Sequence, residues 1–317
     1  MVWQQDGRRF SVVERRGYNG FIPQMMDEKY PGQYLGAYEQ WLNRRRDFVD
    51  MQEGYRKTEQ LARSIVKDMG THMAAWIAFE AEREYWGQKN RAGRVQKQQQ
   101  DHLGLGWANH DHHTFRSSRG GFGSLINLLK IFGFQLREKF YAGAQAGWGA
   151  QVLEQPVCDI TVFSDVDLEP REVETDFAHE SLKERNDLGT VGLWCALHGE
   201  SIFQAGLHHI ACHFDFDAVT EELQNESVRM LQPFSDFDYL KQSFTEGEPW
   251  KVSRMNLDRL LNEEKINETQ HQKFREDGAI GSHLEDIQRD DGFKGFNQES
   301  VSDIIRRTDP RSGFGAA

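Results

Sequence analysis

The first third of the chain carries apolar residues at the spacing of an amphipathic helix. Between residues 37 and 67 they recur three or four positions apart, which predicts one long helix with a buried stripe formed by Tyr38, Trp41, Leu42, Phe48, Val49, Tyr55, Leu61 and Ile65. A second helix is predicted from Met73 to Arg91, because this stretch is rich in alanine, glutamate and aromatic residues. The polar run near Lys97 is interpreted as its frayed end or a linker. We therefore expect residues 1–100 to form a helical region packed on the rest of the protein.

After Gly106 the pattern changes to short β-like runs separated by glycines, with single helices between them, which is typical of an α+β fold. Two stretches repeat the order of strand and then helix. In the first, a strand at 108–116 precedes a helix that ends at Gly133 and has one apolar face: Phe122, Leu125, Ile126 and Leu129. In the second, a strand at 207–214 precedes a helix that Asp217 could cap, with its apolar face formed by Val219, Leu223 and Met230.

Further strands are predicted after each of these helices, at 134–141 and 159–163 in the first stretch and near 239–244 in the second. The two stretches together look like a degenerate tandem repeat. When such repeats pair, equivalent positions meet near a pseudo-twofold axis, where a metal can be shared. We expect residues 101–317 to form one metal-binding domain of this kind.

The composition narrows the choice of partners and compartment. A formal charge of −12 argues against nucleic acid as the main partner, and the basic runs at 44–46 and 91–97 are best explained as solvated helix faces. No window approaches the roughly 18 to 20 apolar residues of a membrane helix, and the first residues lack the apolar stretch of a secretory signal. The three cysteines, Cys158, Cys195 and Cys212, form no CxxC pair and are interpreted as reduced thiols. We expect a cytoplasmic protein.

Side chains of the types that can bind metals are most frequent in the two strands that open the repeats. Strand alternation divides the first segment, residues 109–116, into two faces: His110, His112 and Thr114 on one, Asp111 and His113 on the other. It divides the second segment, residues 207–213, in the same way: His209 and His213 on one face, His208 on the other. A metal could use either face of each segment. Two such strands at equivalent positions favour a shared metal site over separate structural histidines.

Two histidines need an anionic partner to hold a divalent redox metal with open positions, and two histidines with one carboxylate are the typical solution for Fe(II) oxygenases. With 50 acidic residues in the chain, composition does not identify the third ligand. The segment 282–289 is a plausible late strand in which Glu285 alternates with Ile287. On spacing alone, a solvated acid is the better explanation of Glu285.

Several of these segments resemble the 2-oxoadipate dioxygenase/decarboxylase (hydroxyglutarate synthase) family. Residues 112–116, HHTFR, resemble the H-x-x-x-R strand of its first module, and residues 206–212 with 215–219 resemble its N-H-F-T strand and the D-I-D-A-V that follows. Residues 285–289, EDIQR, resemble its E-F-x-x-R metal strand. Two further segments are similar to its L-x-Q-x-S strand and its R-D-G-F-x-x-x-N tail, namely 240–243 and 290–297 with Ile304. The chain departs from the family at His208, at residues 210–213 and at Asp286.

The resemblance implies a vicinal-oxygen-chelate fold, in which tandem βαβββ modules form a curved mixed sheet around a metal. It implies Fe(II) bound by His112, His209 and Glu285, and O2-dependent decarboxylation of a 2-oxo acid to a 2-hydroxy acid one carbon shorter. It also implies that Arg116 binds a carboxylate of the substrate. Gln242 or Ser243 could donate a hydrogen bond to a substrate oxygen; as strand neighbours they face opposite ways, so only one is expected to do so. The expected partners are a small 2-oxo acid and dioxygen.

Two alternatives remain open from the sequence. A glyoxalase-like isomerase or an extradiol-type dioxygenase would keep the fold and change the reaction, because fold does not determine function. A non-catalytic metabolite-binding or assembly protein would use the helical first third as its working surface, with structural histidines. Metal content and oxygen consumption separate these alternatives.

Overall fold

The computed structural model describes residues 2–5, 8–11, 28–102, 110–233, 235–237, 239–289 and 309–311. The tail segment compared above with the family, 290–297 with Ile304, lies outside these residues. In the described part of the chain, no helix is long and apolar enough to cross a membrane.

Four helices follow one another in the first third of the chain: α1 (Tyr30–Leu42), α2 (Met51–Met69), α3 (Thr71–Lys89) and α4 (Arg91–His102). Two short strands, β1 (Val2–Gln5) and β2 (Arg8–Ser11), pair ahead of them and were not predicted. The predicted second helix is confirmed as α3. The run near Lys97 is not a frayed end, because it continues as α4 with Gln96 and Gln100 buried.

The single helix predicted from 37 to 67 is wrong, because the chain breaks between α1 and α2. The Asp50 carboxylate accepts a hydrogen bond from the backbone N–H of Gln52 and so starts α2 as an N-cap. The solvated face predicted for the basic run at 44–46 is wrong for two of its residues. Arg44 and Arg46 are buried and form ion pairs with Glu82 of α3, at 2.5 and 3.1 Å. The segment between α1 and α2 therefore places the Arg44 and Arg46 side chains in the protein interior, beside Glu82.

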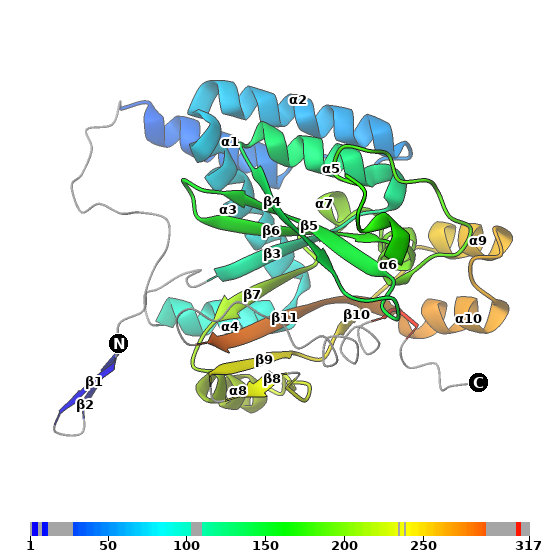
Figure 1. Cartoon of the computed structure of the whole chain (residues 1–317). Helices are drawn as coiled ribbons and strands as arrows, with labels where there is room; N and C mark the ends of the chain where they lie inside the picture. Colours follow the sequence, from blue (N-terminus) through cyan, green and yellow to red (C-terminus); the bar gives the residue numbers. More distant parts are fainter. Residues whose placement is uncertain are drawn as a thin grey trace.

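Among the described residues, nine strands form one mixed, open sheet in the order β4-β5-β6-β3-β7-β11-β9-β8, with β10 paired to β11 (Figure 1). Their bounds are β3 His110–Arg116, β4 Gln135–Tyr141, β5 Trp148–Gln155, β6 Ile160–Asp167, β7 His209–His213, β8 Ser235–Phe237, β9 Leu240–Phe244, β10 Glu248–Trp250 and β11 Ala279–Arg289. The sequence did not predict β5.

The sheet consists of two modules with the same strand order. In the first, β3 is followed by α5 (Arg119–Ile131) and then by β4, β5 and β6, with β3 parallel to β6. In the second, β7 is followed by α8 (Phe216–Asn225) and then by β8, β9 and β11, with β7 parallel to β11. The opening strands β3 and β7 are antiparallel neighbours at the centre of the sheet. This tandem βαβββ topology confirms the predicted α+β, vicinal-oxygen-chelate type of fold.

Several helices interrupt this plan. Helices α6 (Thr190–His198) and α7 (Ser201–Gln204), with the short η1 (Pro170–Glu172), connect the modules, and α9 (Arg254–Asn262) and α10 (Glu268–Asp277) lie between β10 and β11. The cap predicted for the second module's helix is wrong. Asp215, rather than Asp217, accepts from the N–H of Ala218, so α8 starts earlier than predicted and ends before Met230.

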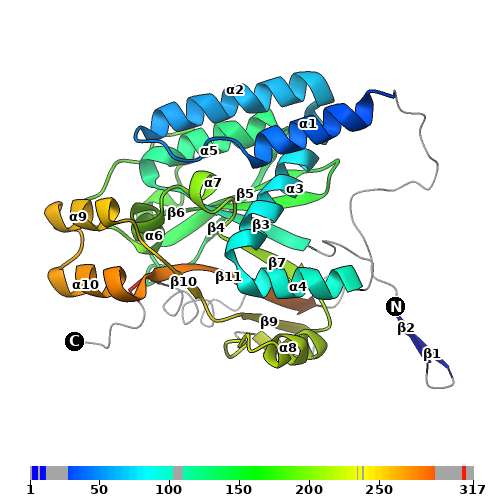
Figure 2. The same cartoon turned by 180° about the vertical axis from the view of Figure 1, so that it is seen from behind.

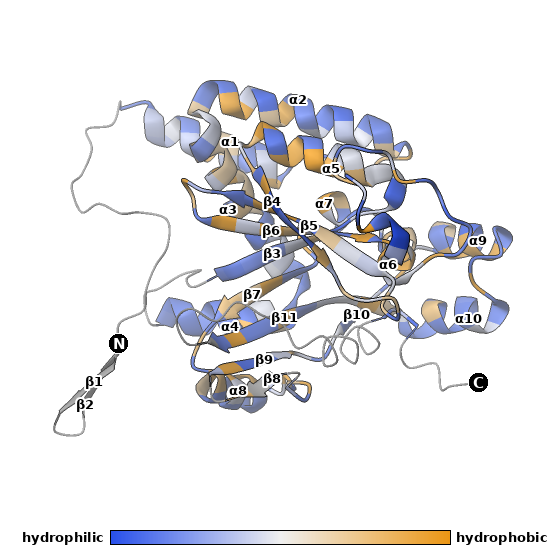
Figure 3. Cartoon of the chain, viewed as in Figure 1, coloured by the Kyte–Doolittle hydropathy of each residue, from blue (hydrophilic) through white to orange (hydrophobic). Residues whose placement is uncertain are grey.

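Several helices cover one face of the sheet. Viewed from behind, α3 and α4 lie in front of the central strands, with α1, α2 and α5 on one side and α8 on the other (Figure 2). Along α2, hydrophilic and hydrophobic residues alternate in patches, which matches one buried stripe (Figure 3). The main core fills the space between these helices and the sheet. On the other face of β3 lie the polar side chains of His112, Thr114 and Arg116.

Candidate metal centre

The register of the three central strands brings distant residues to one place. On β7, Ala211 is the Cα partner of both His112 on β3 and Glu285 on β11, and His209 lies two residues away on the same face. The candidate ligand atoms of His112, His209 and Glu285 all lie within 4.8 Å of one another, and all three residues are buried. We call this group the His-His-Glu cluster.

The spacing within the His-His-Glu cluster suits a single metal ion. The Oε2 atom of Glu285 lies 3.4 Å from Nε2 of His112 and 3.2 Å from Nε2 of His209. Two donor atoms at about 2.1 Å from one ion lie about 3.0 Å apart at a right angle and about 3.4 Å apart at a tetrahedral angle. The donor set, two imidazoles and one carboxylate, is the one typical of non-haem Fe(II) sites. The residues therefore fit the expected ion, and their role as ligands stays a prediction.

A β-bulge decides which histidines of β3 face the cluster. His110 is the Cα partner of Cys212 and His112 that of Ala211, so Asp111 is an extra residue in β3. The prediction that His110 and His112 share a face is therefore wrong. The His110 ring instead lies 5.1 Å from that of His113, which packs 5.2 Å from Phe79 of α3 on the helix-covered face.

Neighbouring polar groups orient two of the candidate ligands. The ring N–H of His112 at Nδ1 donates to Oδ2 of Asp111 at 2.9 Å, which leaves Nε2 toward the cluster. Asp111 also bonds Nε2 of His213 at 2.5 Å. The amide of Gln242 donates to Oε1 of Glu285 at 2.5 Å, which leaves Oε2 toward the two histidines.

Burial and charge set the protonation states of these groups. Burial lowers the pKa of His209 well below its usual value, so its imidazole is neutral at pH 7 and can donate a lone pair. Burial would also lower the pKa of His112, but the hydrogen bond to Asp111 and the charge of Glu285 raise it overall. Burial raises the pKa of Asp111, yet its bonds to His112 and His213 outweigh this and lower it. Asp111 is therefore a carboxylate at any working pH.

Arg116 lies on the same strand and face as His112, four residues farther along β3. It is buried, its guanidinium lies 5.7 Å from the ring of Trp194, and its Nε and Nη1 atoms make no hydrogen bond within the described part of the chain. Its Cα partner is Asp165 on β6. A buried guanidinium with open donors is suited to bind an anion.

Asp165 is a residue of this face that the sequence reasoning missed. It is buried, and one of its oxygens has no hydrogen-bond partner among the described residues. Burial raises its pKa to about 7, and the positive charge of Arg116 acts in the opposite direction. The signal that could have found it is an acidic residue inside the apolar strand β6.

The two predicted hydrogen-bond donors on β9 separate as strand neighbours do. Gln242 lies on the face of the His-His-Glu cluster and contacts Glu285. The hydroxyl of Ser243 donates to the carbonyl of Leu231, and its Cα partner is Asp286 on the opposite face. Of this pair, only Gln242 reaches the His-His-Glu cluster.

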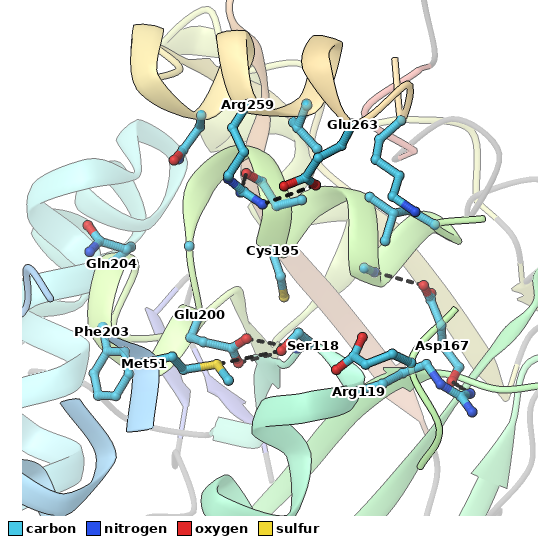
Figure 4. A pocket seen from close by; sticks show the side chains of 18 of the residues that line it. Met51, Ser118, Arg119, Asp167, Cys195, Glu200, Phe203, Gln204, Arg259 and Glu263 are labelled. Atoms are coloured by element: carbon cyan, nitrogen blue, oxygen red, sulfur yellow. Dashed lines mark hydrogen bonds and ion pairs between the residues drawn. The ribbon is translucent and has the colours of Figure 1, made fainter. Parts of the chain in front are cut away.

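A pocket of about 690 Å³ lies between α6, α9 and the start of α5, with Asp167 at the end of β6 in its wall (Figure 4). The Glu200 carboxylate in its wall accepts from the backbone N–H of Ser118 at 3.0 Å and from the hydroxyl of Ser117 at 2.7 Å. Among the described residues, its lining contains none of the His-His-Glu cluster. The pocket is therefore separate from the candidate metal centre.

No protein-family model and no curated protein matches the chain. Among solved structures, a glyoxalase-superfamily protein from Ralstonia eutropha is 12% identical, with a TM-score of 0.44 over 84% of this chain and 97% of that one. A mutant of 4-hydroxymandelate synthase from Streptomyces coelicolor is 13% identical, with a TM-score of 0.37 over 63% of this chain. The match spans 54% of that enzyme, or about half of its length. Methylmalonyl-CoA epimerase from Mycobacterium tuberculosis is 12% identical, with a TM-score of 0.31 over 57% of this chain and 88% of that one. At these values the likenesses assign neither a reaction nor a metal to this chain.

Proposed function

We propose that the protein is an Fe(II)-dependent dioxygenase/decarboxylase, which converts a 2-oxo acid of the 2-oxoadipate type with dioxygen to a 2-hydroxy acid and carbon dioxide. The observation that carries this proposal is the convergence of two imidazole nitrogens and one carboxylate oxygen from three strands at one buried point. The resemblance of these three strands to the 2-oxoadipate dioxygenase/decarboxylase family supports the choice of reaction.

Each residue around the cluster has a defined task in this proposal. Iron held by His112, His209 and Glu285 would supply a Lewis acid for the 2-oxo acid and redox chemistry toward dioxygen. Asp111 and Gln242 hold two of these ligands in orientation through their hydrogen bonds. The Phe163 ring, 4.5 Å from that of His112, adds an apolar wall that limits water.

Arg116 would bind the carboxylate at the far end of the substrate. Four residues of strand separate its Cα from that of His112 by about 13 Å, and the even spacing points both side chains to one face. A guanidinium can hold a carboxylate through two parallel hydrogen bonds, and Nε and Nη1 of Arg116 have none among the described residues. A dicarboxylic 2-oxo acid would then extend from the cluster to Arg116.

The test is oxygen uptake and carbon dioxide release by anaerobically purified protein reconstituted with Fe(II). The substrates are 2-oxoadipate, shorter dicarboxylic 2-oxo acids and monocarboxylic 2-oxo acids. We expect equal amounts of oxygen consumed and carbon dioxide released, with preference for a dicarboxylic acid.

Three variants separate the tasks of the residues. Glu285→Gln should lose iron, because it removes the anionic ligand. Arg116→Lys should keep iron but turn over dicarboxylic acids about tenfold or more slowly, since an ammonium cannot reproduce the paired hydrogen bonds. Arg171→Lys, at an exposed surface site, is the matched control and should behave as wild type.

Two results would contradict the proposal. Iron bound near one per chain without oxygen uptake on any 2-oxo acid would favour an isomerase on the same fold. Absence of stoichiometric metal would favour a metabolite-binding protein.

A further inference from the structure

A second group of histidines lies next to the His-His-Glu cluster. His208, His209 and His283 each offer a ring nitrogen within 4.8 Å of the others. Their ring centroids are 4.9 to 5.3 Å apart, and the exposed fractions of His208 and His283 are only 1% and 2%. We call this group the three-histidine cluster.

Four of the six ring nitrogens of this cluster lack a hydrogen bond of normal geometry within the described residues. These are both nitrogens of His208 and the Nδ1 atoms of His209 and His283; the backbone of Gly281 is close enough to His208 to act on it, and in the described part of the chain His209 and His283 have no such neighbour at Nδ1. Buried polar side-chain atoms in folded proteins nearly always have a partner, because an unmet one costs about 1 to 3 kcal/mol. Three buried imidazole rings this close together, with nitrogens free to donate lone pairs, are suited to bind a metal ion.

We propose that His208, His209 and His283 form a second transition-metal site, which shares His209 with the His-His-Glu cluster. The Nε2 atom of His209 lies 3.2 Å from Glu285 and 3.3 Å from the Thr114 hydroxyl, so it faces the first cluster. Its Nδ1 atom remains for the second site. An imidazole that binds two ions in this way releases its ring proton to solvent, which two adjacent cations favour. The site belongs to a borderline divalent ion such as Zn(II), Co(II) or Cu(II), because these ions suit imidazole ligands.

The fold explains how adjacent histidines meet in one cluster. His208 lies in the bend before β7 and so escapes the alternation that separates neighbours on a strand. His209 is the first residue of β7, and its Cα partner on β11 is His283. Aromatic rings hold the outer members in place, with Trp194 5.3 Å from His208 and Phe244 4.3 Å from His283.

The two sites should differ in affinity. The His-His-Glu cluster contains the carboxylate of Glu285, whereas the three-histidine cluster has no carboxylate, and its shared ligand His209 must lose a ring proton before the second ion binds. We therefore expect the His-His-Glu cluster to fill first and the three-histidine cluster to bind more weakly.

The experiment is an anaerobic Co(II) titration of the metal-free full chain, followed by its visible absorption and by elemental analysis after gel filtration. Wild type should bind two equivalents in two steps. His208→Gln and His283→Gln should each lose the weaker equivalent and keep the tighter one. Glu285→Gln should lose the tighter step. His113→Gln is the matched control: His113 is equally buried but on the helix-covered face, and this variant should keep both equivalents.

The outcomes separate this proposal from the proposed function, because the second site requires the position of His209 and not the reaction. One equivalent in wild type that is lost in Glu285→Gln alone would overturn the second site and leave the iron site intact. One equivalent that is lost in His283→Gln but kept in Glu285→Gln would overturn the iron site and the sharing of His209, because the three-histidine cluster would then hold the single metal. The wild-type stoichiometry decides even if a variant fails to fold, which circular dichroism would reveal.

Discussion

The replacement of Asp111 by asparagine tests how the protein prepares His112 for a metal. Asp111 accepts from Nδ1 of His112 at 2.9 Å and from Nε2 of His213 at 2.5 Å, and it is a carboxylate at any working pH. Asparagine keeps the volume but has one acceptor oxygen in place of two, and it carries no charge. In Asp111→Asn the tautomer and orientation of His112 are no longer held.

The expected magnitude follows from the bond that is lost. A hydrogen bond to a charged group contributes about 1.5 to 3 kcal/mol, and a tenfold change in affinity is about 1.4 kcal/mol. The variant should therefore bind Fe(II) or Co(II) about 10- to 100-fold more weakly than wild type, the usual effect of removing the partner of a metal-binding histidine. Glu285→Gln should be affected more strongly, because it removes a ligand.

The assay is an anaerobic competition titration against a coloured chelator, at one pH and one salt concentration. His213→Gln is the matched control, because it removes the other partner of Asp111 and keeps the bond to His112. Its metal affinity should change much less. Equal affinities of Asp111→Asn and wild type for the tighter equivalent, with that equivalent lost in Glu285→Gln, would refute the role of Asp111. An equal loss in His213→Gln would show that the effect is not specific to His112.

Three further predictions concern stability. Glu82→Gln should lower the unfolding free energy by about 3 to 5 kcal/mol in denaturant titrations, because Arg44 and Arg46 lose their buried partner. The control is Glu84→Gln at an exposed position of the same helix, which should change the unfolding free energy by less than about 0.5 kcal/mol. Burial raises the pKa of Asp286 from 3.8 to about 8, so the folded protein keeps a proton that the unfolded chain loses between these pH values. As the pH rises through this range, the unfolding free energy of metal-free wild type should fall relative to that of Asp286→Asn, by up to about 1.4 kcal/mol per pH unit. A melting temperature that falls in parallel for both proteins would contradict this. A chelator should lower the melting temperature of metal-loaded wild type by more than that of Glu285→Gln, which lacks the tighter site.

The local pattern of the chain was enough to predict the parts of the site that depend on neighbours in sequence. The apolar stripe of α5 and the even spacing of His112 and Arg116 on one strand follow from the periods of helix and strand. The repeated order of strand and helix predicted two modules, and the topology confirms them. The same reasoning failed at residues 43–50, because the partner that turns Arg44 and Arg46 inward, Glu82, lies 36 or more residues away.

The choice among equivalent-looking side chains was left to the tertiary structure. The sequence offered either face of each histidine segment and 50 acidic residues. The bulge at Asp111 turns His110 away from His112, and the pairing of β11 with β7 selects Glu285. A one-residue slip in register moves every side chain of a strand to the other face. By itself, the sequence therefore determined the strands that could carry a site. Only long-range strand pairing, which periodicity within a strand does not encode, decided which of their side chains meet.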